Sequence, residues 1–478
     1  MTMLSDKTGL AFLNADELLA GYRARAFSPT EVLDQVLERA NRFSSLNAFI
    51  TIDEDGARGA AREADDTYAK DPWAELPALL GVPVTVKDLL RTKGLRTTRG
   101  SLVTREFVPD EDAPAVARLR ESGAVIVGKT NTSEGGWKGD AGNRLIGPSA
   151  NPWDTRFTAG GSSGGAGAAA ALGLGVIAVG TDGGGSVRIP ASFCGVVGFK
   201  PTLGSIPYYP PSPEGLSHVG PLTRSVADAA LGVSVMAGFD PRDPTSIPQT
   251  GARYDLKASS RRLKIRVATS LGFATAGSQA CAATRAAAEV LADAGHEVVE
   301  ADLDVPDPIS TMMTLWSGHE SVSYLQNLDE VADLLDPGYE RLIRQGRELT
   351  AVDLAKAHEE RASLRLLMLE QMSGFDMLLT PTMIDSAFPL GLDAPLGSDG
   401  QESSGLAWTP FTYLFNLTGQ PAISLPAGLD DTGMPVGIQL VGSLHADADV
   451  LATARQYEEL RPWQPNYRDL NPIVAPPS

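Results

Sequence analysis

Cysteine, histidine and excess basic charge are all scarce in this sequence. Its two cysteines, Cys194 and Cys281, exclude a disulfide framework and are typical of a protein of the reducing cytoplasm, which is where we expect it. We interpret Cys194 as a packing residue because no histidine stands near it in the sequence. The five histidines are scattered and form no cluster at metal-ligand spacing, so we expect no metal site and no cofactor.

Long hydrophobic runs are absent as well. The longest nearly apolar stretch, residues 166–180, is shorter than the ~20 residues that span a bilayer, and we predict a buried helix that runs into a strand. The first residues lack the basic start and apolar stretch of a secretory signal. A net charge of −19 repels nucleic acid and anionic membranes, which favours a small uncharged substrate as the partner. No pattern indicates an oligomeric state, and a homodimer stays open.

Alternating helix and strand patterns are present, and they predict an α/β fold. Amphipathic helices, one opened by Ser28 and Pro29, are predicted over residues 1–70, a segment expected to pack on a larger domain of residues 71–478. No linker separates the two, so we expect one structural unit. We predict strands or helices at residues 82–90, 112–130, 263–270, 278–295, 376–382, 420–428 and 435–442, the last three as buried strands of one sheet. In the helix of residues 278–295 we expect Ser278 to be the cap.

Glycine is concentrated in one segment. Residues 160–202 hold 13 glycines among 43 positions, far above the ~7% usual in proteins, so this segment must exclude side chains for a reason. The pattern G-x-G-x-x-A at residues 165–170 leaves a dinucleotide-binding module open as a remote alternative, although no strand is predicted before it. The pattern G-x-S-x-G at residues 161–165 lacks the same strand, and no Gly-Lys-Ser/Thr follows to complete a phosphate-binding loop.

Serine and lysine chemistry is a further interpretation of this region. A serine hydroxyl is a weak nucleophile until a base takes its proton, and a lysine can be that base if it is kept neutral. Lys87, Ser162 and Ser186 offer these groups. A structural role for Lys87 also stays open, because most such lysines reach water or pair with a carboxylate such as Asp88.

A family resemblance extends over nearly the whole chain. Residues 147–204, GPSANPWDTRFTAGGSSGGAGAAAALGLGVIAVGTDGGGSVRIPASFCGVVGFKPTLG, resemble the signature of the amidase signature family. Flanking segments resemble that family's blocks in the same order, from VPVTVKDLL at residues 82–90 to TGQPAISLPAGLDDTGMPVGIQLVG at residues 418–442. The resemblance implies the family's fold, a single large α/β domain with a central mixed β-sheet covered by helices on both faces.

The resemblance also implies a Ser-cisSer-Lys triad that forms an acyl-enzyme on small amides and, as a further expectation, on carbamates. In such enzymes the serine at the position of Ser186 is the nucleophile, that of Ser162 lies in a cis peptide, and the lysine at Lys87 is the base. Gly183 departs from the family, which more often has a larger residue there. Because glycines leave the backbone open, we expect an oxyanion hole made by the N–H groups of Gly183, Gly184, Gly185 and Ser186.

Residues beside the triad are expected to support it. Ser163 is expected to help hold the loop of Ser162. Asp182 and Arg188 bracket the nucleophile, and we interpret them as a buried structural ion pair. Lys200 receives the same structural interpretation.

The sequence defines the substrate less closely. An apolar or aromatic acyl or amine portion is favoured by aromatic residues that we expect to line the pocket, although each alone is equally typical of core: Trp137, Tyr208, Tyr209, Trp316, Trp408 and Phe415. Within the family, the glutamine amidase subunit of a tRNA-dependent amidotransferase is the main alternative, and it needs a partner chain. A catalytically inactive scaffold is disfavoured because all three triad positions are present.

Overall fold

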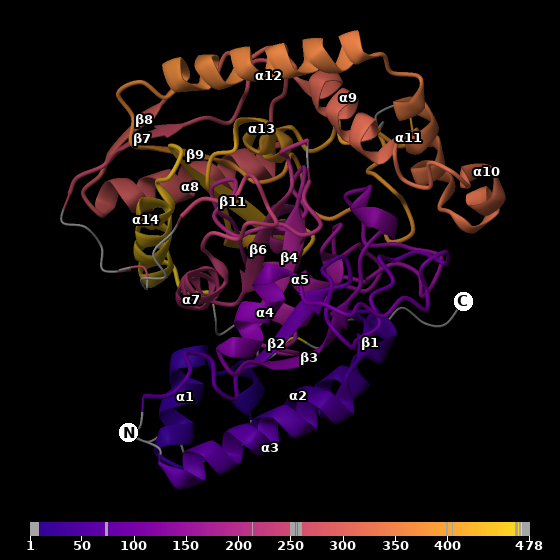
Figure 1. Cartoon of the computed structure of the whole chain (residues 1–478). Helices are drawn as coiled ribbons and strands as arrows, with labels where there is room; N and C mark the ends of the chain where they lie inside the picture. Colours follow the sequence, from indigo (N-terminus) through magenta and orange to yellow (C-terminus); the bar gives the residue numbers. More distant parts are fainter. Residues whose placement is uncertain are drawn as a thin grey trace.

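A mixed sheet of 11 strands runs through the described part of the chain, which we analysed as a computed structural model (Figure 1). The structure describes residues 9–71, 75–212, 214–248, 254, 256, 261–397, 400–403, 405–463, 467 and 470. The strand order is β1-β3-β2-β4-β6-β5-β10-β11-β9-β7-β8. The strands are β1 (Phe49–Ile52), β2 (Pro83–Lys87), β3 (Val125–Thr130), β4 (Ile177–Asp182), β5 (Val197–Lys200), β6 (His218–Thr223), β7 (Lys264–Val267), β8 (Glu297–Glu300), β9 (Met377–Pro381), β10 (Ala422–Leu429) and β11 (Pro435–Gly442).

Helices cover both faces of the sheet, as predicted (Figure 1). The helices of the N-terminal segment lie at the bottom of Figure 1, and α9, α11 and α12 lie at the top. The α-helices of the described residues are α1 (Ala15–Arg23), α2 (Pro29–Arg42), α3 (Glu54–Lys70), α4 (Pro114–Glu121), α5 (Gly164–Ala171), α6 (Arg188–Cys194), α7 (Val226–Met236), α8 (Ser278–Asp293), α9 (Ile309–Glu320), α10 (Leu328–Val331), α11 (Pro337–Arg347), α12 (Ala351–Gln371), α13 (Pro410–Thr418) and α14 (Asp447–Leu460).

Hydrophobic periodicity predicts about half of these elements correctly, and α6, α7, α9 to α14, β5, β6 and β8 were not predicted. α2 begins at Pro29 behind a capping box, in which the Glu31 N–H donates to Ser28 Oγ and the Ser28 N–H donates to Glu31 Oε2. The predicted C-terminal strands β9, β10 and β11 belong to one sheet. Two details differ. Residues 49–52 form the short edge strand β1, which pairs antiparallel with β3, and Gly277 rather than Ser278 occupies the cap position of α8.

The glycines after Ser162 allow close packing around α5. A Cβ on Gly165 would lie 2.4 Å from the Asn131 nitrogen, and one on Gly167 would lie 3.0 Å from Pro190. The chain then enters β4 without an exposed residue, as the apolar run predicts. Because neighbouring backbone fills the space beside these glycines, they have a packing function and leave no room for the pyrophosphate of a dinucleotide.

Parallel pairing brings the polar residues of the glycine-rich region to one edge of the sheet. β2 and β4 are parallel neighbours, with Thr85 opposite Ala178 and Val86 opposite Val179. Lys87 ends β2, and Asp182 ends β4, so both stand at the carboxyl ends of adjacent strands. This is the edge at which open α/β sheets commonly bind ligands.

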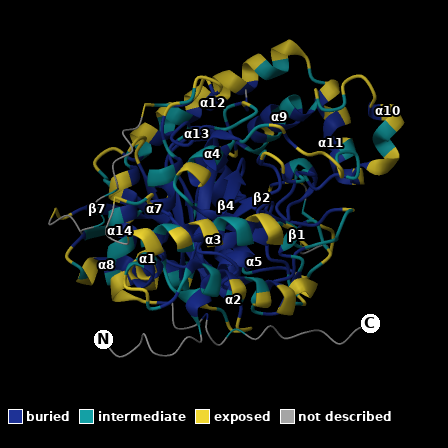
Figure 2. Ribbon diagram, turned by 60° about the horizontal axis from the view of Figure 1, so that its bottom comes forward, coloured by how far each residue is buried: buried dark blue, intermediate teal, exposed yellow. Residues whose placement is uncertain are grey.

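Residues are most buried in the central sheet and least buried on the outer helices (Figure 2). The central strands and α5 are buried, whereas α3 and α12 carry many exposed residues on their outer faces. Among the helices within the described ranges, none is both long enough and apolar enough to cross a membrane.

Candidate active site

The structure brings the predicted triad together. Lys87 Nζ, at the end of β2, lies 2.7 Å from Ser162 Oγ in the loop before α5. The peptide bond between Gly161 and Ser162 is cis. The Ser163 N–H donates to the carbonyl oxygen of Ser186 at 3.2 Å, which joins the two serine loops. Ser162 and Ser186 line the same cavity.

Lys87 is held in a site that favours its neutral form. Its side chain is fully buried, and burial lowers its pKa well below the ordinary value, although the charge of Asp182 acts in the opposite direction. Its hydrogen-bond partners are two hydroxyls, Ser162 Oγ and, at 2.9 Å, Thr181 Oγ1. Asp88 instead accepts from Thr98 and faces Lys129. The structural alternative, in which Lys87 reaches water or pairs with Asp88, is therefore wrong.

The glycine turn before the nucleophile contains backbone N–H groups without protein acceptors, and two of its residues, Gly183 and Ser186, line the cavity. Within the described residues, the N–H groups of Gly183, Gly184 and Ser186 donate to no protein acceptor. Gly185 differs from the prediction, because its N–H donates to Asp182 Oδ1 at 2.8 Å. Its φ of 134° lies in a region that favours glycine, and a Cβ there would lie 2.3 Å from Thr412 Oγ1. Gly185 thus shapes the turn, and its N–H is already occupied.

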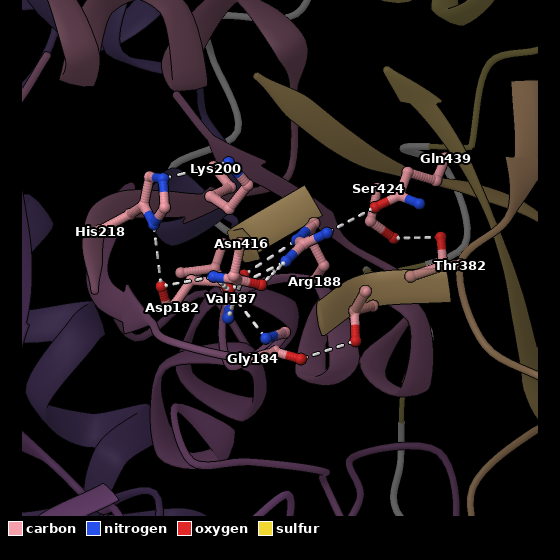
Figure 3. Close-up of polar contacts among 12 residues, drawn as sticks. Asp182, Gly184, Val187, Arg188, Lys200, His218, Thr382, Asn416, Ser424 and Gln439 are labelled. Atoms are coloured by element: carbon pink, nitrogen blue, oxygen red, sulfur yellow. Dashed lines mark hydrogen bonds and ion pairs between the residues drawn. The ribbon is translucent and has the colours of Figure 1, made fainter. Parts of the chain in front are cut away.

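An ion pair beneath this turn holds it in place (Figure 3). The Arg188 guanidinium donates to both carboxylate oxygens of Asp182, each at 3.0 Å, and both side chains are fully buried. Burial raises the pKa of Asp182, but the charge and hydrogen bonds of Arg188 outweigh it and hold that pKa below its usual range. Arg188 also donates to Gln439 Oε1 and Asn416 Oδ1. The predicted ion pair is present, and its other partners come from β11 and α13.

Two residues near the triad complete its supports. Ser163 Oγ donates to the Thr181 carbonyl oxygen at 3.1 Å and accepts from the Thr181 N–H at 3.3 Å, so it ties the loop of Ser162 to β4. Lys200 is fully buried and donates to the Gln420 carbonyl oxygen, beside His218 (Figure 3). Both residues therefore serve the structure around the triad.

A cavity of about 900 Å³, its open mouth included, lies in front of the serines. Tyr208 and Trp316 line it, as predicted. The remaining lining residues are Leu89, Arg99, Gly135, Gly136, Ser162, Thr181, Gly183, Ser186, Pro210, Pro211, Ser212, Glu214, Ser217, His319, Glu320 and Ser323.

Four aromatic residues expected in the pocket lie elsewhere. Phe415 is fully buried in the core, and the ring of Trp408 packs against Phe193 and Phe388. Trp137 packs against α11, where a Cβ on Gly338 would lie 2.1 Å from its ring. Tyr209 turns away from its neighbour Tyr208, and its hydroxyl donates to Glu111. These rings fill gaps between elements, which a sequence pattern does not distinguish from lining a pocket.

Sequence reasoning missed several polar residues of the cavity wall. Thr181, which contacts Lys87, stands directly before the predicted Asp182 in a strand that is buried throughout, so strand alternation gave no signal for it. Arg99, His319 and Glu320 come from distant segments, and no local signal marks them. They make the cavity more polar than the predicted aromatic set implied.

Comparison with known proteins places the chain in a class. It matches the Amidase family over residues 31–451. It is 36% identical over 476 residues to an acylamidase of Rhodococcus erythropolis, covering 95% of this chain and 96% of that protein. It is also 36% identical over 466 residues to a glutamyl-tRNA(Gln) amidotransferase subunit of Synechococcus sp. (strain CC9311), covering 90% of this chain and 94% of that one.

Solved structures agree. A bacterial aryl acylamidase of the amidase signature enzymes superimposes with a TM-score of 0.88 at 27% identity, covering 96% of this chain and 98% of that chain. The complex of 6-aminohexanoate cyclic dimer hydrolase with its substrate superimposes with a TM-score of 0.85 at 29% identity, covering 95% of this chain and 98% of that chain. The chain belongs to the Amidase family and has the amidase signature fold. It is an enzyme that hydrolyses the C–N bonds of amides, and the predictions of family and fold are confirmed.

Proposed function

We propose that this enzyme cleaves small aryl or aliphatic amides through an acyl-enzyme on Ser186, and that small carbamates are a second substrate class. The observation that carries the proposal is the buried lysine at hydrogen-bond distance from a serine of the cavity. Lys87 hydrogen-bonds to two hydroxyls and to no carboxylate, so no salt bridge holds a proton on it. The likeness to the acylamidase supports the choice of amides.

Acylation begins with a proton relay. Neutral Lys87 takes the proton of Ser162, which takes the proton of Ser186 as Ser186 Oγ bonds to the carbonyl carbon. The N–H groups of Gly183 and Gly184 stabilise the oxyanion that develops. When the C–N bond breaks, the relay returns the proton to the departing amine. The acyl group then remains as an ester on Ser186.

Deacylation uses the same groups with water in place of the amine. The relay takes a proton from water, the hydroxide bonds to the ester carbon, and Ser186 leaves with the proton. A carbamate follows the same route, because its carbonyl carbon accepts the same attack and its C–N bond breaks in the same step. Its deacylation product is a carbonic half-ester, which loses carbon dioxide.

Release of p-nitroaniline tests the proposal. Anilides of small aromatic and aliphatic acids, and a carbamate analogue in parallel, are assayed from pH 6 to 10 with wild type, Ser186→Ala and Ser205→Ala. Ser205 is a matched control because its buried hydroxyl has no hydrogen-bond partner among the described residues. We expect hydrolysis by wild type and Ser205→Ala, and none above background by Ser186→Ala. Equal hydrolysis by all three proteins contradicts the role of Ser186.

The relationship to amidotransferase subunits favours one alternative, ammonia production from glutamine. Such an activity needs a second chain that uses the ammonia. Glutamine hydrolysis faster than anilide hydrolysis, together with a second protein that purifies with this chain from its native host, would support the alternative over the amidase.

A further inference from the structure

Within the part of the chain that the structure describes, one arginine of the cavity wall, Arg99, makes no hydrogen bond or salt bridge through its side chain. Arg99 has a φ of 56°, and its backbone is fixed on both sides: its N–H donates to the Asp88 carbonyl oxygen, and its carbonyl oxygen accepts from the Gly135 N–H. Among the described residues, none hydrogen-bonds or forms a salt bridge with its guanidinium, which lines the same cavity as Ser162 and Ser186. A guanidinium in a cavity wall presents a rigid set of N–H donors.

Each carboxylate of the cavity has a protein donor for one oxygen, and Glu214 Oε2, which has no hydrogen-bond partner among the described residues, lies 3.3 Å from His319 Nδ1. Glu320 Oε2 accepts from the Tyr339 hydroxyl at 2.6 Å, and Glu214 Oε1 accepts from the Ser217 hydroxyl at 3.0 Å. A second donor is unpaired instead: the indole N–H of Trp316, whose side chain is nine-tenths buried, has no acceptor among the described residues. The wall therefore holds two donors without a protein acceptor among the described residues: the half-buried guanidinium of Arg99 and the buried indole N–H of Trp316, for which a missing acceptor is costly.

We propose that Arg99 binds a second, uncharged carbonyl oxygen of the substrate, away from the bond that is cleaved. The proposal rests on the proposed function, because it assigns a substrate class to the same cavity. Preferred substrates then carry a ketone, a second amide or a second carbamate group in addition to the scissile amide.

Charge in the cavity favours an uncharged acceptor over a carboxylate. Burial lowers the pKa of Arg99, but Tyr339, Tyr208 and Glu320 act in the opposite direction, so its pKa stays above the ordinary value and it remains a cation. Glu320 lies in the same wall as this charge, and Glu214, which faces His319 at 3.3 Å, adds a second carboxylate. A substrate carboxylate would meet repulsion from both, whereas a carbonyl oxygen gains a hydrogen bond without that repulsion.

Matched substrates distinguish whether Arg99 binds an uncharged carbonyl oxygen, a carboxylate or neither. On the acyl side, the anilides of pentanoic acid, 4-oxopentanoic acid and succinic acid differ in carrying a methylene, a ketone or a carboxylate. On the amine side, the acetamides of 4-ethylaniline and 4-acetylaniline differ in the same way. Amine release is measured by chromatography for wild type, Arg99→Met, Arg99→Lys and Arg105→Met. The last is a control on an exposed arginine whose side chain lies near Glu106 and does not line the cavity.

We expect Arg99→Met to lower kcat/KM at least about tenfold for the ketone substrate on one side of the scissile bond, and less than about twofold for its hydrocarbon partner. Each comparison is a ratio to wild type, so the intrinsic reactivity of the substrates cancels. For the ketone substrate, kcat/KM of Arg99→Lys should lie between those of wild type and Arg99→Met, because lysine keeps the charge but lacks the planar guanidinium. If Arg99→Met does not fold, Arg99→Lys carries the same comparison. Arg105→Met should match wild type.

Three results overturn the inference. Equal loss on every substrate indicates a structural role for Arg99, and no loss on any indicates no contact. The largest loss on the succinic anilide indicates an anion site, which fits glutamine better than a neutral amide. Wild type that hydrolyses none of these amides overturns the proposed function as well, whereas hydrolysis without a ketone preference overturns this inference alone.

Discussion

The indole of Trp316 occupies the space that a side chain at position 183 would need. A Cβ on Gly183 would lie 2.3 Å from Cζ3 of Trp316, which is far inside van der Waals contact. Gly183 is the first residue of the glycine turn, and its N–H is one of the expected oxyanion donors. A larger residue, which the family resemblance led us to expect at this position, would meet this ring, which comes from α9 and fills the site from the other side.

Substitution at position 183 should damage both packing and catalysis. We expect Gly183→Ala to destabilise the fold by about 1–3 kcal/mol through overpacking and to lower kcat/KM by about 10- to 100-fold, because the turn must shift. Gly183→Ala combined with Trp316→Leu should recover much of the stability, with a coupling energy of about 1 kcal/mol or more in a double-mutant cycle. Gly59→Ala is the control, because no atom lies within 4 Å of a Cβ there. Wild-type activity and stability in Gly183→Ala would disprove the steric argument.

Activity should rise with pH because Lys87 acts only when neutral. Its pKa lies well below the ordinary 10.5, so the rise falls below pH 10.5 and activity is lost as pH drops through the lowered pKa. A profile of kcat/KM from pH 5 to 10 measures this limb. A profile that shows no loss of activity toward low pH anywhere in this range would count against Lys87 as the base.

The same residue should cost stability at neutral pH. Between the lowered pKa and 10.5, the unfolded chain binds one more proton at Lys87 than the folded chain, so this group makes wild-type stability rise with pH. Lys87→Met lacks that contribution. We expect the Tm of Lys87→Met to exceed that of wild type most at low pH, and this difference to shrink toward pH 10.5. The activity of the variant should be reduced at least about 10⁴-fold. An excess in Tm of the variant over wild type that grows with pH would contradict a lowered pKa for Lys87.

Thr181 should tune the base. Thr181→Val removes one hydroxyl acceptor of Lys87 Nζ while keeping the shape of the side chain. Because that acceptor favours the charged amine, its loss should move the acidic limb of the pH profile lower by about one unit, and kcat should fall by about tenfold as the amine is held less firmly. Thr85→Val, on the same strand as Lys87, is the control, since its buried hydroxyl has no partner among the described residues. An acidic limb of the pH profile at the same pH as in wild type would show that the contact of Thr181 with Lys87 has no effect on the pKa of the base.

The ion pair under the glycine turn should be indispensable to folding. Asp182→Asn leaves the buried guanidinium of Arg188 without a carboxylate, and we expect a loss of about 3–5 kcal/mol in the free energy of unfolding. Urea denaturation measures it. Glu300→Gln, which breaks the exposed pair of Arg285 and Glu300, should change stability far less. A loss of the same small size in both variants would contradict the account of this pair.

Local sequence predicts the parts of the site that lie on one stretch of chain. Ser162, Ser186 and the pair of Asp182 and Arg188 all fall within the glycine-rich segment, which carries the family resemblance that assigned the roles of the two serines. Lys87 was assigned as the base by the same resemblance, because local sequence left a structural role open. The parallel pairing of β2 with β4 then brings it to the serines.

The rest depends on tertiary packing that no short pattern encodes. Asn416 and Gln439 contact Arg188 from more than 200 residues away, and the N–H of Gly185 is lost as an oxyanion donor because Asp182 accepts it. Arg99 was missed because an arginine in a loop is ordinarily solvated. The aromatic residues were predicted as one group, yet a ring gives no indication of whether it faces a cavity or another ring.

The covalent intermediate offers the most direct test of the account. Wild type is mixed with a fast-leaving p-nitroanilide, quenched in acid within the first turnovers, and analysed by intact-protein and peptide mass spectrometry. We predict a mass increase of one acyl group on the peptide that contains Ser186, formed by wild type and absent from Ser186→Ala. An acyl group on another residue, or product formed by wild type without any acylated protein, would contradict a mechanism built on Ser186.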